Sequence, residues 1–195
     1  NLISPTGRSA AGLTASLAGG SFGQFTGSGQ LGLANADGDA LLHADFTRRA
    51  GYRQHNDSRR LNLGGNAGVR LNDNIRARLF ANYAELDFDI PGPLPLAILR
   101  ETPRIVWDGP KVTPNGAVFP GPNVVRDRPG RIARQMQAGT RVSGVFDAHV
   151  VDLLFGVTHT DDSFRFPISA GIRDTTGDDL TFVARYAYRP DEAAA

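Results

Sequence analysis

Cysteine is absent from the 195 residues, and methionine and tryptophan each occur once. Without cysteine there is no disulfide framework, no thiolate zinc site and no thiol nucleophile. No run of about 18 consecutive apolar residues occurs, which excludes a transmembrane helix. The formal net charge is +1 and no block of Lys and Arg stands out, so nothing in the composition indicates a nucleic-acid partner.

The sequence also lacks a signal peptide. Its first residue is Asn1, and no basic stretch with an apolar run comes after it. We therefore expect the chain to begin inside a longer protein. Membrane strands remain open as an interpretation, because a strand that crosses a bilayer needs only about 9–11 residues, of which every second one is apolar.

What the sequence does contain is alternation of apolar and polar residues, which is typical of strands with two unlike faces. In the clearest example, Leu61 and Leu63 share one face of a strand, while Arg60 and Asn62 share the other. The predicted strands are residues 13–19, 25–34, 40–50, 60–71, 75–83, 134–146, 148–159 and 180–189. The pattern predicts an all-β fold, an antiparallel up-and-down meander of about eight strands.

The connections between these strands alternate in length. The short ones are residues 35–39, residues 72–74 and the passage at Asp147. They are rich in Asn, Asp and Gly, which tolerate the left-handed conformations of tight turns. The long ones are residues 51–59, 87–133 and 160–179, whereas the first connection on that side, near residues 21–24, is short. In a meander all short turns then lie at one end and all long loops at the other, as in outer-membrane barrels.

The composition of the two faces favours a membrane barrel. The polar face mixes Gly, Ser, Asn and Thr with scattered Arg, which suits a wet lumen, and the apolar face is rich in Ala and Leu, which is loose for a close-packed core. Aromatic residues near strand ends would form interfacial girdles. We expect Phe25, Phe46, Tyr83 and Phe182 at the long-loop end, and Phe146 and Tyr188 at the turn end.

Five segments, in order along the chain, are similar to parts of a known family. They are Asn1-Leu2-Ile3-Ser4-Pro5-Thr6-Gly7-Arg8, residues 19–25 (GGSFGQF), residues 45–53 (DFTRRAGYR), residues 88–94 (FDIPGPL) and residues 166–186, which begin Phe166-Pro167-Ile168-Ser169. They resemble, respectively, the end of the plug domain, the first hairpin tip, the third strand with its loop, the third extracellular loop, and the fourth loop with its following strand in TonB-dependent outer-membrane receptors. The resemblance is to the branch of ferric-citrate-type siderophore receptors.

The resemblance implies a barrel of about 22 strands with a plug domain folded inside it. Residues 1–10 would then be the end of the plug and the link into the barrel, and residues 11–195 the first part of the barrel. The implied function is energy-dependent uptake of a ferric siderophore or a similar scarce nutrient across the Gram-negative outer membrane. The implied partners are that ligand, the membrane lipid, and the TonB–ExbB–ExbD complex, reached through receptor parts outside this sequence.

No catalytic machinery is recognisable, so we expect neither an enzyme nor a cofactor. The four histidines, His43, His55, His149 and His159, lack metal-ligand spacing. The pairs Asp161-Asp162 and Asp178-Asp179 are expected to be solvated charges in the fourth loop.

Ligand contacts are expected in the long loops, where arginine and aromatic residues occur together. Such a surface would hold an anionic iron chelate by bidentate hydrogen bonds and by stacking. The candidate residues are Tyr52, Arg53, His55, Arg100, Arg104, Trp107, Arg126 and Arg128.

Two alternatives make different structural predictions. A self-contained eight-stranded outer-membrane barrel, with a structural or adhesion role, requires strand 13–19 to pair with strand 180–189. A soluble β-sandwich binding module requires protein to cover the apolar face on which Leu42, Phe46, Leu61, Leu63 and Val69 lie.

Overall fold

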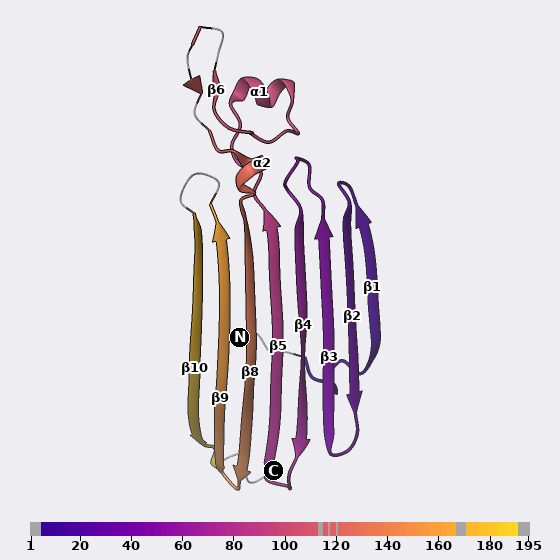
Figure 1. Cartoon of the computed structure of the whole chain (residues 1–195). Helices are drawn as coiled ribbons and strands as arrows, with labels where there is room; N and C mark the ends of the chain where they lie inside the picture. The colour runs from indigo at the N-terminus through magenta and orange to yellow at the C-terminus, as the bar shows by residue number, and fades with distance from the viewer. Residues whose placement is uncertain (1–4, 113–114, 117, 120, 167–170, 191–195) are drawn as a thin grey trace.

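A computed structural model describes residues 5–112, 115–116, 118–119, 121–166 and 171–190. Eight strands form one antiparallel sheet, in the order β1-β2-β3-β4-β5-β8-β9-β10 (Figure 1). They are β1 (Gly12–Gly20), β2 (Gln24–Ala34), β3 (Gly38–Arg49), β4 (Ser58–Arg70), β5 (Ile75–Asp89), β8 (Gly130–Phe146), β9 (His149–Arg165) and β10 (Ile172–Tyr188). The predicted all-β meander is confirmed. Asn1–Ser4 and Pro167–Ser169, on which parts of the family resemblance depend, lie outside the described residues.

The chain leaves the sheet between β5 and β8. This insertion carries α1 (Leu96–Glu101), the short strands β6 (Lys111–Val112) and β7 (Val118–Phe119), and α2 (Val124–Asp127). It lies beyond one end of the sheet (Figure 1). Within the described residues, no helix is long and apolar enough to cross a membrane.

The short turns form as their residues predict. The side chain of Asn35 accepts hydrogen bonds from the backbone N–H groups of Asp37 (3.0 Å) and Gly38 (2.8 Å). The side chain of Asn72 does the same at the next turn and bonds the N–H of Ile75 at 2.8 Å. Asp147 adopts a left-handed backbone conformation with φ of 49°. Asparagine and aspartate at these positions therefore fix where the hairpins turn.

The sheet does not close. In the part of the chain that the structure describes, β1 pairs with β2 and β10 pairs with β9, so β1 and β10 are its two edges. The prediction of a self-contained eight-stranded barrel, in which these two strands would pair, is therefore wrong for this chain.

The last two strands are longer than predicted. β9 runs to Arg165 and β10 begins at Ile172, so the expected loop 160–179 is mostly sheet. Both aspartate pairs of that segment lie on strands, where Asp161 is the register partner of Thr176 and Asp178 that of His159. Alternation gave no signal here because both faces are polar.

The apolar face of the sheet has no cover. Leu79 is 62% exposed and Leu180 is 76% exposed. The sandwich hypothesis required this face to be buried, yet Leu42, Leu63 and Val69 are all exposed. In the described residues no second layer packs on it, and the sandwich prediction is wrong.

The apolar stretch of this face shifts along the strand direction between β3–β4 at one side of the sheet and β9–β10 at the other. The register row that contains Phe46 and Leu61 on β3 and β4 continues into Glu85 on β5, Arg134 on β8 and Asp161 on β9. The row continues into Thr176 on β10, where apolar residues begin only at Leu180 and extend down to Tyr188. The apolar band therefore crosses the strands obliquely.

The aromatic residues only partly follow the predicted girdles. At the turn end, Phe146, His149 and Tyr188 share one register row, as expected for Phe146 and Tyr188. Phe182 and Tyr83 are corrections. Phe182 lies in the middle of β10, directly opposite Phe155, and Tyr83 lies in the middle of β5. The prediction misplaced them because the beginning of β10 and the end of β5 were taken as loop.

The N-terminal segment, residues 5–10, lies on the polar face. The Pro5 carbonyl accepts a hydrogen bond from Asn66 Nδ2 (3.0 Å), and the Gly7 N–H donates to Asp39 Oδ1 (3.0 Å). Beside this segment lies Leu41, which is 2% exposed and is the one buried apolar residue of the described sheet. The segment is thus fixed to β3 and β4 by bonds and by burial.

Glycine is required at position 7 by close backbone contact. A Cβ placed there would lie 2.2 Å from the Ala40 carbonyl oxygen and 2.4 Å from that of Leu33. Neither oxygen can move without breaking the sheet, so a side chain would lift the segment.

We expect Gly7→Ala to detach residues 5–10 from the sheet and to expose Leu41, because a backbone contact below 3 Å cannot relax. Hydrogen exchange at the Gly7 and Leu41 positions would then accelerate by about tenfold or more, since about one charge-assisted hydrogen bond is lost. Gly177→Ala is the matched control, because a Cβ there meets nothing within 4 Å. Equal exchange in both variants would contradict this interpretation.

Candidate functional site

The long connections combine into one folded unit at the end of the sheet. We call it the loop cap: residues 50–57 together with the described residues of 90–129. Val106, Trp107 and Val124 are buried there, and the Val124 N–H donates to the Trp107 carbonyl (2.8 Å). Among the described residues, the only other buried apolar side chain is that of Leu41, which lies in the sheet. The loop cap therefore has a hydrophobic core of its own, which the sheet lacks.

Trp107 was a candidate for ligand contact, and it lies in this core at 5% exposure. Gly121 packs against its ring so closely that a Cβ there would lie 2.1 Å from Nε1. Lys111 lies over the ring at 5.8 Å and pairs with Asp108, which lowers the pKa of the Asp108 carboxyl. The surroundings of Trp107 are those of a packing residue.

Arg53 fastens the two parts of the loop cap to each other. Its guanidinium donates to the carbonyls of Gly92 (2.7 Å), Pro91 (3.1 Å) and Ile105 (3.0 Å). The neighbouring Gln54 N–H donates to the Arg104 carbonyl (2.8 Å). Burial lowers the pKa of the Arg53 guanidinium. The planar fork of arginine suits this arrangement, because several carbonyls at different angles are satisfied by one side chain.

His55 connects the loop cap to the sheet. Its Nε2 lies 2.7 Å from the Pro129 carbonyl, and its Nδ1 lies 3.3 Å from Asp89 Oδ2 at the end of β5. Both ring nitrogens therefore face acceptors, and both contacts are hydrogen bonds when both nitrogens carry a proton. His55 holds the base of the loop cap.

Four aromatic and arginine side chains form a continuous stack on the surface of the loop cap and the adjoining sheet. Arg104 lies over the Tyr52 ring at 5.2 Å, and Tyr52 meets Phe22 edge to face at 5.4 Å. Arg49 lies over Phe22 at 6.0 Å. Tyr52 and Arg104 were both candidates, and both are exposed. Phe22, in the short turn between β1 and β2, was missed because a lone aromatic in a tight turn carries no signal of its neighbours.

The remaining candidates are exposed arginines on the two short helices. Arg100 is in the last turn of α1. Arg126 on α2 pairs with Asp127 (Nε to Oδ1, 2.6 Å), and its side chain is 74% exposed. Arg128 ends α2 in a left-handed conformation with φ of 42°. Of the eight candidates, the structure thus brings Tyr52, Arg53 and Arg104 together and leaves these three arginines separate from that group.

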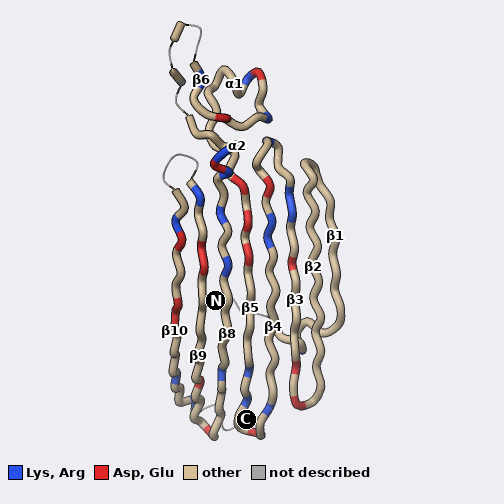
Figure 2. Tube along the Cα trace, viewed as in Figure 1, with Lys and Arg blue, Asp and Glu red and all other residues tan. Residues whose placement is uncertain are grey.

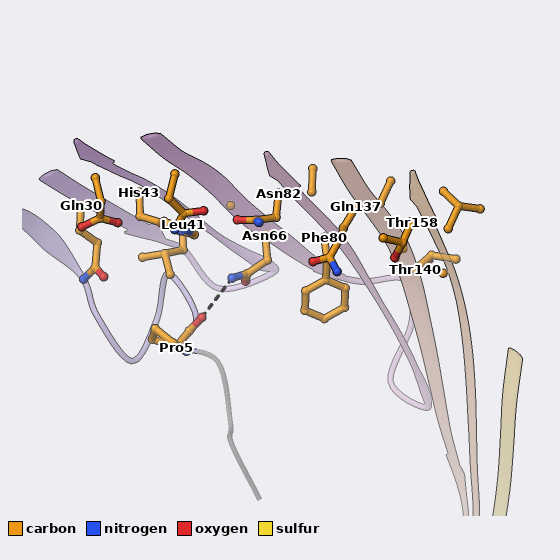
Figure 3. A pocket seen from close by; sticks show the side chains of 18 of the residues that line it. Pro5, Gln30, Leu41, His43, Asn66, Phe80, Asn82, Gln137, Thr140 and Thr158 are labelled. Carbon is orange, nitrogen blue, oxygen red and sulfur yellow. Dashed lines mark hydrogen bonds between the residues drawn. The ribbon is translucent and has the colours of Figure 1, made fainter. Parts of the chain in front are cut away.

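A cavity of about 830 Å³ lies over the polar face (Figure 3). Its wall includes Gln30, His43, Asn82, Gln137 and Thr158, which come from five different strands and share one register row. Pro5 of the N-terminal segment lines the same cavity (Figure 3). The polar face is therefore hollowed here, with amide, hydroxyl and imidazole groups in its wall beside the apolar side chains of Leu41, Phe80 and Leu154.

One ion pair supports the floor beneath the N-terminal segment. Arg78 of β5 donates to both carboxylate oxygens of Asp39 of β3, at 2.9 and 2.6 Å, and also to Asn66 of β4. The same Asp39 accepts the Gly7 N–H. A bidentate arginine pair of this kind fixes three strands and the segment in one geometry.

No group of three or more metal-binding side chains occurs within the described ranges. No protein-family model matches the chain, and no curated protein matches its sequence.

We expect Arg53→Ala to loosen the loop cap while the sheet stays intact, because three carbonyls lose their donor. Amide exchange at Gln54 and Ile105 would accelerate by about tenfold or more, as charge-assisted bonds are each worth roughly 1.5–3 kcal/mol. Arg53→Lys would rescue only in part, because an ammonium cannot span the carbonyls. Arg100→Ala, on an exposed helix, is the control and should leave exchange unchanged.

Proposed function

We propose that this chain is part of the wall of an outer-membrane barrel of the TonB-dependent receptor type, and that the receptor takes up a ferric siderophore or a similar scarce nutrient. The observation that carries the proposal is the oblique, uncovered apolar band. Exposed apolar surface of this extent is characteristic of an interaction surface or a membrane face.

The slope of the band supports a membrane as its partner. The loop-side boundary of the band lies at the row of Phe46 on the β3–β4 pair, and at the row of Leu42 and Leu180 on the β9–β10 pair. These two pairs are four strand spacings apart, and the boundary moves by four residues along the strands between them. At about 3.3 Å per residue and 4.8 Å per strand this is a slope of roughly 35°. Strands of membrane barrels are tilted by about 35–45°.

The two open edges support a larger barrel. Lipid offers no hydrogen bonds to unpaired backbone groups, so a sheet in a bilayer must close. β1 and β10 therefore need further strands as partners, which the proposed barrel of about 22 strands supplies.

The polar hollow fits the lumen of such a barrel. The N-terminal segment lies inside it, as the last residues of a plug domain would. The Gly7, Asp39 and Arg78 contacts then join the end of the plug to the barrel wall.

In the proposed receptor the loop cap would be the part that meets the ligand. Arg104, Tyr52 and Phe22 offer a cationic and aromatic surface to an anionic chelate. Arg53, His55 and Trp107 hold that surface in place from beneath, so their role is positioning.

Cysteine labelling tests the membrane assignment, because residues 1–195 contain no cysteine. In the intact protein, with any cysteine outside these residues replaced, a fluorophore at Leu79→Cys should be quenched by brominated lipid in vesicles. The same label at Gln137→Cys, on the polar face of β8, is the control and should not be quenched. Quenching of Gln137→Cys alone, or of neither label, would contradict the proposal.

Uptake by Gram-negative cells tests the transport assignment. Radioactive ferric citrate and a ferric hydroxamate serve as probes, with and without a functional TonB protein. We expect TonB-dependent uptake of at least one probe, and about tenfold weaker binding after Arg104→Ala, since a charge-assisted contact is lost. Arg165→Gln, at the loop end of β9 but outside the stack of Arg104, Tyr52 and Phe22, should bind normally. TonB-independent uptake, or none, would overturn the assignment.

A further inference from the structure

Two arginines lie side by side on the outer face, at the loop-side boundary of the apolar band. Arg48 of β3 and Arg59 of β4 are register partners, and both are exposed. Like charges directly opposite each other in a sheet are destabilising. A bound anion would stabilise two arginines in this position.

The chain does not supply that anion at ion-pair distance. In the ranges that the structure describes, no carboxylate lies within 4 Å of either guanidinium. Asp87 is the other register partner of Arg59, and Glu85 lies one row below it on the same face. Glu85 is already bound by Arg134 at 2.9 Å. Arg48 faces Phe25 on its other side.

The surface directly below the two arginines is apolar. Phe46 and Leu61, the next outward residues toward the middle of β3 and β4, are themselves register partners. Phe25 meets Phe46 at a ring distance of 6.4 Å. A cationic pair thus sits immediately above an apolar floor, a combination that fits the headgroup and the acyl chains of one lipid.

Charge near this level is distributed unevenly across the sheet. Figure 2 shows blue positions toward the loop end of β3 and β4, and both blue and red positions toward the same end of β9 and β10. On the outer face of β9 and β10 the charges toward the loop end are Asp161, Asp174 and Asp178, together with Arg165 at the end of β9. The balance of charge favours an anionic group on the β3–β4 side, where Arg48 and Arg59 are adjacent, over the β9–β10 side, where three carboxylates accompany one arginine.

We propose that Arg48 and Arg59 form a docking site for the phosphate of an anionic membrane lipid, whose acyl chains lie over Phe46 and Leu61. The inference rests on the proposed membrane barrel. Two guanidinium groups, each with its planar fork of donors, match the oxygens of a phosphate. The bound phosphate removes the repulsion between the two arginines.

The test uses the intact protein with a fluorophore at Ala44→Cys, an exposed outward position one step below Phe46 on β3. Vesicles of phosphatidylcholine contain either brominated phosphatidylglycerol or brominated phosphatidylcholine at the same fraction. We expect the anionic lipid to associate about fivefold more strongly or better, since a basic residue near a membrane surface contributes about 1 kcal/mol. Added salt should reduce the preference.

Arg48→Gln with Arg59→Gln should abolish the preference and leave quenching by the neutral lipid unchanged. Arg60→Gln is matched to Arg59→Gln, because Arg60 is the adjacent residue and its side chain is on the polar face, opposite Thr47. It should retain the preference. Equal quenching by the two lipids in the unaltered protein would overturn the lipid site but leave the barrel standing. Absence of quenching by either lipid would overturn the barrel itself.

Discussion

The whole structure depends on an uninterrupted backbone register. From β1 to β10 each ladder pairs consecutive residues without a skipped position. Because side chains alternate between faces, a single inserted residue would exchange the apolar and the polar face of every following residue in that strand. The apolar band, the polar hollow and the Arg48–Arg59 pair all exist because this phase is kept across the sheet. Asn35, Asn72 and Asp147 keep it by fixing the turns.

Stability is distributed unequally between the two parts of the molecule. The sheet has backbone hydrogen bonds and one buried leucine, Leu41, among its described residues, whereas the loop cap is packed around Val106, Trp107 and Val124. A sheet of this kind gains little from internal burial, and under the proposed function the membrane would supply what a core supplies elsewhere. The loop cap has no such need, which suits its place beyond the end of the apolar band.

The sequence predicted the strands and the hairpins well, because each depends on local patterns. The alternation around Leu61 and Leu63 is readable from neighbouring residues, and so is the turn chemistry of Asn72. The strand ends near Asp161 and Asp178 were missed because alternation disappears once both faces are polar. The role of Arg53 was also hidden, since its acceptors lie about 40 to 50 residues away in sequence. The sequence alone does not distinguish one loop arginine from another, because their hydrogen-bond acceptors are known only from the fold.

The attachment of the N-terminal segment has a mechanical consequence. The segment crosses strands, and its contacts follow one another: Pro5 to β4, Gly7 to β3, and Arg8 to the turn between β2 and β3 at the Asn35 carbonyl (2.6 Å). Because these three contacts reach different strands and a turn, a force applied at Pro5 would act first on the Pro5 bond and only then on those of Gly7 and Arg8. Under such a force the segment would leave the sheet one contact at a time.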